Sequence, residues 1–205
     1  MDVLEADGVR LRPLRHRDRA AWHRVRAENA DWLRPWEATS PVPGAPLGFA
    51  EYVAQSRRLA RRGEALTYVI EVDGELVGQL SVSSIVLGSA RSAAVGYWVS
   101  RHVAGRGIVP TAVALATDHC FTHLQLHRIE VNIRPENAAS LRVVEKLGFR
   151  DEGVRRRFLH IDGEWRDHRT FALVAEEVPE GLLERWRRHR GRHAGDVPGS
   201  GPTRG

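Results

Sequence analysis

The sequence predicts a mixed α/β fold in which helices flank one central, twisted and mostly antiparallel sheet. First, two pairs of strand-like segments are joined by Asp-Gly turns at 73–74 and 162–163, which are typical of antiparallel hairpins. Second, apolar segments of helical length, roughly 109–123 and 137–147, alternate with further strands. Third, 205 residues with 42% hydrophobic and 28% charged content suit one globular domain with a sizeable core.

The first part of the chain is predicted to supply one strand and two helices. Apolar and basic residues alternate in Val9–Arg15, as expected of an opening edge strand. Asp18 is a suitable N-cap for a helix that extends to about Asn29. A second helix is expected over Phe49–Arg62, because its apolar residues follow one stripe and Gly63 can close its C-terminus.

Trp32 and Trp36 lie on either side of a proline in the segment that joins these two helices. Exposed indole rings carry a large apolar surface, so two tryptophans in a loop are expected to have a specific role. They can cover the core, or they can form the wall of a substrate cleft. The two roles are compatible, and the sequence alone leaves both open.

The rest of the chain is predicted to form most of the sheet and three further helices. An antiparallel meander is followed by two helices with a strand between them, then by a hairpin and a closing helix. From Gly191 the Gly, Pro and Arg content predicts disorder, so a single domain is expected over 1–190 with a basic tail over 191–205. The expected strands are 66–72, 76–86, 90–100, 128–133, 154–161 and 165–174, and the expected helices are 109–123, 137–147 and 179–190.

The net charge of +5 does not by itself predict a nucleic-acid site. Much of the excess lies after Glu184, where we expect a solvated basic tail, and no nucleic-acid recognition motif accompanies it. Weak attraction to ribosomal RNA near a protein substrate remains compatible with this charge.

The chain is expected to be cytoplasmic and not to associate with a membrane. No apolar run approaches the roughly 20 residues that a bilayer span requires, and the N-terminus lacks the layout of a signal peptide. The single cysteine, Cys120, excludes an internal disulfide and fits a reducing compartment. Its place in an apolar helix predicts a buried, unreactive thiol rather than a covalent nucleophile.

A glycine-containing loop, 104–107, connects a predicted strand to the long apolar helix that follows. Glycines at such a turn let backbone N–H groups gather around an anion, and the start of the helix adds its positive dipole at the same point. The segment is therefore suited to hold phosphate. No Gly-Lys-Ser/Thr follows and the spacing is not Gly-x-Gly-x-x-Gly, which argues against a nucleoside-triphosphate loop and a dinucleotide fold.

Two motifs resemble the acetyl-CoA-binding core of the GNAT superfamily of N-acetyltransferases. The first is HVAGRG at 102–107, which is similar to the family pattern Gln/Arg-x-x-Gly-x-Gly/Ala but has His102 in the Gln/Arg position. The second is NAAS at 137–140, followed by EKLGF at 145–149. The similarity covers roughly 9–174. The segments LRPWE, HRIEVNIRPENAAS and FLHIDGEWRDHRTFAL further resemble the ribosomal-protein-alanine N-acetyltransferase branch.

The resemblance implies a GNAT fold whose central strands splay at one end, with acetyl-CoA as the co-substrate and no metal. Pantetheine is expected to fill the opening between the strands 97–100 and 128–133, while the backbone of the glycine loop holds the pyrophosphate. The residues expected to contact acetyl-CoA are Trp98, Val99, His102, Val103, Ala104, Gly105, Arg106, Gly107, Ile108, Asn137 and Ser140.

The same resemblance implies that an amine attacks the thioester directly in a ternary complex, without a nucleophilic side chain. Ser140 resembles the family's proposed proton donor to the leaving thiolate, and Tyr97 is a further catalytic candidate on the neighbouring strand. Asn137 can also act simply as a helix N-cap. Glu130 is a candidate base, but it can equally be the ion-pair partner of an arginine. The other candidates for the base are His160, His168 and water.

The branch resemblance implies that the acceptor is the N-terminal α-amine of a protein, such as a ribosomal protein. An α-amine with a pKa of about 8 is roughly a tenth neutral at pH 7, so it needs less help from a base than lysine does. A small-molecule amine or antibiotic, or a non-catalytic acetyl-CoA-binding regulatory module, remain alternatives, and the protein is expected to be a monomer or a homodimer. The acceptor is expected to enter between two loops that carry Trp32, Trp36, Asp162, Glu164, Trp165 and Asp167.

Overall fold

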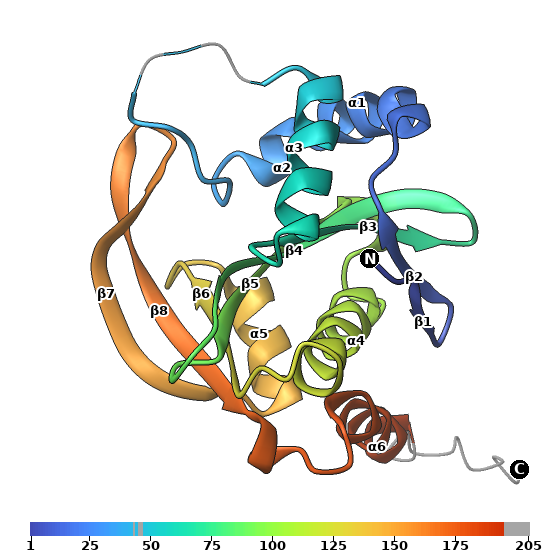
Figure 1. The fold of residues 1–205 in the computed structure, drawn as a ribbon, viewed down its shortest axis with the longest axis vertical. Helices are drawn as coiled ribbons and strands as arrows, with labels where there is room; N and C mark the ends of the chain where they lie inside the picture. The colour runs from blue at the N-terminus through green and yellow to red at the C-terminus, as the bar shows by residue number, and fades with distance from the viewer. Residues whose placement is uncertain (43, 45–46, 195–205) are drawn as a thin grey trace, which may run out of the picture.

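One twisted sheet of eight strands extends through the part of the chain that the structure describes, residues 1–42, 44 and 47–194 (Figure 1). This computed structural model confirms the mixed α/β fold. Along the sheet the strands follow the order β1-β2-β3-β4-β5-β6-β8-β7. Their bounds are β1 (Leu4–Ala6), β2 (Val9–Pro13), β3 (Leu66–Val72), β4 (Glu75–Val86), β5 (Ser92–Val99), β6 (Arg128–Ile133), β7 (Arg150–Ile161) and β8 (Glu164–Val174).

Helices cover both faces of this sheet. Three helices, α4, α5 and α6, gather on one face, and α1 and α3 lie on the other (Figure 1). The short helix α2 follows α1 directly. Their bounds are α1 (Arg19–Glu28), α2 (Ala30–Leu33), α3 (Phe49–Arg61), α4 (Ile108–Thr122), α5 (Ala138–Leu147) and α6 (Leu182–Ala194).

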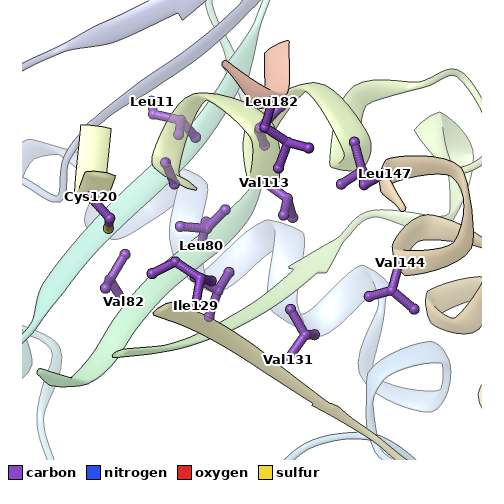
Figure 2. Close-up of a cluster of buried hydrophobic side chains, with 14 of the residues drawn as sticks. Leu11, Leu80, Val82, Val113, Cys120, Ile129, Val131, Val144, Leu147 and Leu182 are labelled. Atoms are coloured by element: carbon purple, nitrogen blue, oxygen red, sulfur yellow. The ribbon is translucent and has the colours of Figure 1, made fainter. Parts of the chain in front are cut away.

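The larger core lies between the sheet and helices α4, α5 and α6. Figure 2 shows Leu80 of β4 and Ile129 of β6 in this interior, together with Val113 of α4, Val144 of α5 and Leu182 of α6. All five side chains are buried. Removal of such apolar surface from water is the main stabilising contribution to a fold of this size. The packing fixes α4 and α5 against the two central strands, β5 and β6.

A smaller core of aromatic and aliphatic side chains holds α1 and α3 on the opposite face. The ring of Trp22 on α1 lies 6.1 Å from that of Phe49 on α3 and 5.6 Å from that of Trp98 on β5. Val53 of α3 and Val69 of β3 complete this cluster. The helices that follow β2 are therefore anchored directly to β5.

The central pair of strands differs from the rest of the sheet. Strands β5 and β6 are parallel, whereas every other neighbouring pair of the sheet in the described residues is antiparallel. A parallel pair needs a long crossover, and α4 supplies it between β5 and β6. The N-terminus of α4 consequently begins where β5 ends.

Two expectations at the N-terminus were wrong. The strand Val9–Pro13 is not an edge strand, because β1 pairs with it through the register Leu4↔Leu11. The turn between them, Asp7-Gly8, has φ values of 50° and 78°, as two-residue hairpins require. The second correction concerns the tryptophan loop, which begins with a helical turn, α2. Both elements are too short to produce a clear periodic pattern.

Two predicted boundaries also need correction. Strand β7 begins at Arg150 rather than at 154, because its irregular pairing with β8 hides the alternation of side chains. Helix α6 begins at Leu182 and continues to Ala194, so the tail predicted from Gly191 is helical at its start. Residues 195–205 lie outside the described residues.

A single carboxylate on α4 caps α6. Asp118 accepts hydrogen bonds from the backbone N–H groups of Leu182 (2.6 Å) and Leu183 (3.0 Å), at the start of α6. Such bonds satisfy N–H groups that have no partner within the helix. Burial raises the pKa of Asp118, and the two backbone hydrogen bonds offset part of the rise. The cap thus holds α6 against α4.

We expect Asp118→Ala to lower the free energy of unfolding by about 1 kcal/mol, the usual effect of losing an N-cap side chain. Urea denaturation followed by circular dichroism measures this change. Asp118→Asn is the matched control, because its amide oxygen can still accept one of the two hydrogen bonds and should preserve more of the stability. Equal stability of the alanine variant and the unmodified protein would show that the cap contributes nothing.

Candidate active site

The sheet opens between β5 and β6, which both lie wholly in the described part of the chain. Their parallel pairing runs from Ser92↔Arg128 to Ala94↔Glu130 and goes no further, although β5 continues to Val99. Beyond this point the two strands leave each other's backbone groups unpaired. An extended ligand can bind to such free edges as an additional strand. The splayed centre predicted from the sequence is therefore present.

Two hydrogen bonds identify the backbone groups of β5 that face this opening. The N–H of Ser100 donates to the carbonyl of Val77 at the β4 edge (2.7 Å). Backbone groups alternate between the two edges of a strand, so those of Val99 and Tyr97 face the β6 edge. Consistently, the indole Nε1 of Trp32 donates to the Val99 carbonyl (3.0 Å). Trp32 thus covers one end of the opening, and the neighbouring backbone groups are left for a ligand.

The glycine loop follows β5 after a single turn of 3₁₀ helix, Arg101–Val103. Gly105 and Gly107 each have a φ of 81°, in the left-handed region that favours glycine. A Cβ atom at Gly105 would meet no heavy atom within 4 Å, so a ligand can approach the backbone closely. Helix α4 begins at Ile108 with its unpaired N–H groups beside the loop. This geometry suits a pyrophosphate group.

The side chains of this loop divide into two groups. His102, Ala104 and Arg106 are exposed, whereas Val103 and Ile108 are buried in the larger core. The buried pair anchors the loop. The exposed His102 and Arg106 can reach an anion bound above it, with Arg106 as a permanent positive charge.

Helix α6 supports the glycine loop, an arrangement that the sequence analysis missed. The indole Nε1 of Trp186 donates to Oγ1 of Thr111 (2.9 Å), and Thr111 donates in turn to the carbonyl of Gly107 (3.0 Å). Trp186 is buried, and its ring lies 3.4 Å from the position that a Cβ of Gly107 would take. Trp186 and Thr111 are 75 residues apart, so no local pattern connects them.

Tyr97 and Ser140 meet on the α5 side of the opening. Tyr97 packs against the larger core, and its buried hydroxyl lies near the Ser140 side chain, at a geometry too poor to count as a hydrogen bond, with no better partner among the described residues. Burial raises the pKa of this hydroxyl, and the Ser140 side chain offsets part of the rise. A buried donor without a partner is unfavourable. The Tyr97 hydroxyl therefore keeps its capacity to donate to a ligand atom that comes within reach.

Asn137 is the N-cap of α5, the helix that carries Ser140. Its Oδ1 accepts a hydrogen bond from the N–H of Ser140 (3.0 Å). The capping alternative considered for Asn137 is thus observed. It fixes Ser140 in the first turn of the helix, next to Tyr97.

Two arginines hold the carboxylate of Glu130. Nε of Arg128 donates to it at 3.0 Å and Nη2 of Arg155 at 2.7 Å. These contacts correspond to the ion-pair alternative considered for Glu130. The residue also belongs to the last registered β5–β6 pair, with Ala94, so it stands where the opening begins. To accept a proton, the carboxylate would have to give up one of these hydrogen bonds.

A second polar group lies on the same face of the sheet as Glu130, beside the free part of β6 and opposite to the face with Tyr97 and Ser140. Thr170 of β8 donates to Oδ1 of Asn132 on β6 (2.7 Å), and His168, two residues before Thr170, lies on the same face of β8. Nδ1 of His168 lies 3.1 Å from the carbonyl oxygen of Arg166, which can only accept, so Nδ1 carries the proton and Nε2 keeps its lone pair. Burial lowers the pKa of His168, so the ring is neutral at pH 7.

The loop after α2 is attached to the β7–β8 hairpin, which rises to meet it in Figure 1. Ala38 forms a β-bridge with Ile161, and the N–H of Thr39 donates to the carbonyl of His160 (2.8 Å). The hydroxyl of Thr39 also lies 2.7 Å from Nδ1 of His160. The two loops predicted to border the acceptor therefore lie side by side, and His160 connects them.

A hollow of about 280 Å³ lies beside this attachment, and its lining includes Arg26, Glu37 and Asp162. Arg26 pairs with Glu37, whereas the carboxylate of Asp162 is exposed. An ammonium group entering here would meet the negative charge of Asp162. Asp167, by contrast, accepts a hydrogen bond from the N–H of Arg157 within the hairpin (2.8 Å).

The tryptophans predicted to bind ligands lie in different places. Trp32 and Trp36 are half-buried beside the opening, where the guanidinium of Arg134 lies 5.5 Å from the centre of the Trp36 ring. Trp165 is 53% exposed at the hairpin. Trp98, predicted to contact acetyl-CoA, directs its ring into the smaller core. Only Trp32 and Trp36 of these four border the opening.

Cys120 lies outside this site. It is fully buried, which confirms the predicted burial, and burial raises the pKa of its thiol to about 12, as expected of an unreactive thiol. Within residues 1–42, 44 and 47–194, no three His, Cys, Asp or Glu side chains gather in a way that could bind a metal ion. In the same residues, none of the helices has the length and apolar character that crossing a bilayer demands.

Known proteins are similar to this chain over most of its length. The family model described as an acetyltransferase (GNAT) domain matches residues 9–150. The probable N-acetyltransferase YjcK of Bacillus subtilis (strain 168) is 32% identical over 178 residues, which cover 84% of this chain and 97% of YjcK. The ribosomal protein uS5-alanine N-acetyltransferase of Escherichia coli (strain K12) is 30% identical over 169 residues, which cover 80% of this chain and 87% of that protein.

A solved structure extends the similarity to the whole fold. RimJ of Mycobacterium smegmatis, in complex with CoA-disulfide, is 43% identical and superposes with a TM-score of 0.85. The match covers 93% of this chain and 94% of RimJ. With the family match and the related sequences, it shows that this chain is an N-acetyltransferase and belongs to the GNAT acetyltransferase family.

Proposed function

We propose that this enzyme uses acetyl-CoA to acetylate the N-terminal α-amine of a protein, such as a ribosomal protein. The opening between β5 and β6 is the observation that supports this proposal most strongly. Through it, groups on one face of the sheet can meet groups on the other. The Tyr97 hydroxyl lies on one face, and Trp32 and Trp36 border the other. The name of the Escherichia coli relative supports a ribosomal protein as the substrate.

Acetyl-CoA fits the side of the opening that carries the glycine loop. The backbone of 103–108 and the N-terminus of α4 would bind the pyrophosphate. The free edge of β5 would pair with the amide groups of pantetheine. In this arrangement the sulfur atom would lie next to the Tyr97 hydroxyl, which has no hydrogen bond of good geometry within the described residues, and next to Ser140.

Transfer of the acetyl group forms a C–N bond and breaks the C–S bond of the thioester. The amine loses a proton, and the departing sulfur becomes a thiolate that needs a hydrogen-bond donor. Burial raises the pKa of the Tyr97 hydroxyl, so this group stays protonated and can donate to the thiolate. Ser140, whose position the Asn137 cap fixes, is the second hydroxyl at this point.

His168 is the best candidate for the base. Its ring is neutral at pH 7 and presents the Nε2 lone pair, since Nδ1 donates to a carbonyl. It lies with Asn132 and Thr170 on the acceptor face. There it would take the proton from the amine, either directly or through a water molecule. Glu130 is held by two arginines, so it would have to give up one of these hydrogen bonds to take the proton, whereas Nδ1 of His160 lies beside the hydroxyl of Thr39, where the two acceptor loops meet.

The acceptor side suits a flexible peptide end. The path between the tryptophan loop and the hairpin offers two indole walls, Trp32 and Trp36, and the exposed carboxylate of Asp162. Indole walls pack against a peptide chain, while the carboxylate attracts its ammonium group. An α-amine also loses its proton more readily than lysine, which suits a histidine base.

We expect the protein to acetylate a peptide that has a free N-terminal alanine or serine and an internal lysine. The same peptide with a blocked N-terminus should remain unmodified, and mass spectrometry of both products tests this. Trp36→Ala should raise KM for the free peptide by roughly tenfold, because one aromatic contact is lost. Calorimetry should show an unchanged affinity for acetyl-CoA in this variant.

The other outcomes separate the alternatives. Equal acetylation of both peptides would assign the acceptor to lysine. Turnover with a polyamine or an aminoglycoside, and with neither peptide, would assign it to a small molecule. Binding of acetyl-CoA without turnover of any amine would indicate a regulatory module.

Tyr97→Phe should lower kcat by about 10²-fold and leave the affinity for acetyl-CoA nearly unchanged, because only the departing thiolate needs the hydroxyl. Ser140→Ala is the comparison, and it should have a smaller effect if Tyr97 is the principal donor. Full activity of Tyr97→Phe together with a large loss in Ser140→Ala would transfer the role to Ser140.

His168→Asn should lower kcat by about 10²-fold or more, as removal of a general base does, with acetyl-CoA binding retained. In the unmodified enzyme, activity should decrease as the pH falls through the lowered pKa of His168, because protonation removes the lone pair. Glu130→Gln serves as the contrast and should retain most of the activity. The reverse order of these two losses would identify Glu130 as the base.

A further inference from the structure

The side chain of Asn29 joins the end of α1 to the end of β5 by three hydrogen bonds. Its Nδ2 donates to the carbonyl of Val25 (2.8 Å) and to Oγ of Ser100 (3.1 Å), and its Oδ1 accepts from the N–H of Arg101 (2.8 Å). Asn29 and Ser100 are 6% and 0% exposed. An amide side chain has two donors and two acceptor lone pairs, so three of its four possibilities are used. We call these contacts the Asn29 bridge.

The Asn29 bridge spans the two sides of the candidate active site. Asn29 stands at the junction of α1 and α2, on the side where the acceptor is proposed to bind. Ser100 and Arg101 end β5 and lead into the glycine loop, on the side proposed for acetyl-CoA. These positions are 71 and 72 residues away from Asn29 in the sequence.

A second contact attaches α2 to the same end of β5. Trp32, within α2, donates its Nε1 hydrogen bond to the Val99 carbonyl, and the guanidinium of Arg101 lies 5.9 Å from the centre of its ring. Helix α2 comprises only Ala30–Leu33, and one helical turn does not hold its own conformation. Its orientation therefore depends on its attachments to the rest of the fold, and two of these, the Asn29 bridge and the Trp32 hydrogen bond, reach the end of β5.

We propose that Asn29 is a positioning residue for acetyl transfer, which holds Trp32 across the open end of the β5–β6 gap. It would thereby set the distance between the acceptor amine and the thioester. This inference rests on the proposed function, because it assigns Trp32 to the wall of the acceptor path. Displacement of a bound reactant by about 1 Å can reduce a rate by about 10²-fold, so the alignment of α2 matters for turnover.

The role predicts a separation between acceptor and cofactor effects. Asn29→Ala removes all three hydrogen bonds and leaves α2 free to shift, together with Trp32. The hydrogen bonds of the Asn29 side chain go to Val25, Ser100 and Arg101 and not to the backbone of 103–108 or the hydroxyl of Tyr97, so the binding of acetyl-CoA should persist. A residue that merely stabilised the fold would reduce activity only as far as it reduced the folded fraction.

The test compares Asn29→Ala with two other variants. Ser100→Ala removes one partner of the bridge and keeps the two backbone contacts. Val53→Ala opens a cavity in the smaller core, on the same layer of helices, and removes none of the three hydrogen bonds of the Asn29 bridge. We expect kcat/KM for the peptide to fall about 10²-fold in Asn29→Ala and only a few-fold in Ser100→Ala. Val53→Ala should lower the melting temperature by about as much as Asn29→Ala does, and it should keep its activity. The affinity for acetyl-CoA should stay within about twofold in all three variants.

Hydrogen exchange separates this inference from the proposed function. The Arg101 amide donates to Asn29, so its exchange should accelerate in Asn29→Ala and stay slow in Val53→Ala, whichever amine the enzyme acetylates. If no peptide is acetylated, the proposed function fails. The three variants are then compared with the amine that the enzyme does acetylate. Unchanged kcat/KM in Asn29→Ala, or an equal loss in Val53→Ala, would overturn the positioning role.

Discussion

The early end of the pairing between β5 and β6 is the constraint on which the rest of the site depends. After Ala94 and Glu130 the two strands leave backbone groups unpaired in the middle of a sheet, where such groups are normally satisfied. The fold gathers its ligand-binding elements at this point. Helix α4 starts beside it, α5 brings Ser140 to one face, and the tryptophan loop closes the other.

Side chains from distant parts of the chain keep the loops around this gap in place. Trp186 supports the glycine loop through Thr111, and Asp118 holds the helix that carries Trp186. Asn29 performs the corresponding task on the acceptor side. None of these residues belongs to a recognisable catalytic motif. They nevertheless determine where backbone donors and indole rings lie, so the chemistry rests on residues outside the motifs.

The sequence predicts the parts of this fold that local patterns specify. Asp-Gly turns, apolar stripes and the two motif halves locate the hairpins, the helices and the glycine loop, since each depends on neighbours in the chain. Contacts between distant residues leave no such pattern, which is why the roles of Trp186 and Asn29 were missed. Glu130 illustrates an intermediate case, because its place on a strand is predictable and its arginine partners are not. Strand β1, with three residues, is too short for a period to show.

The burial of Cys120 has a practical consequence for work with this enzyme. The chain has one cysteine, and in the folded state it is sealed within α4 and the larger core (Figure 2). Mixed disulfides form through thiolates that are accessible to the attacking reagent, so the folded protein should not become covalently linked to free CoA under oxidising conditions. An aromatic disulfide reagent would therefore titrate the CoA sulfhydryl with little background from the protein. In the absence of CoA, the same reagent would react with Cys120 only as the chain unfolds, and its colour would then report global opening of the structure.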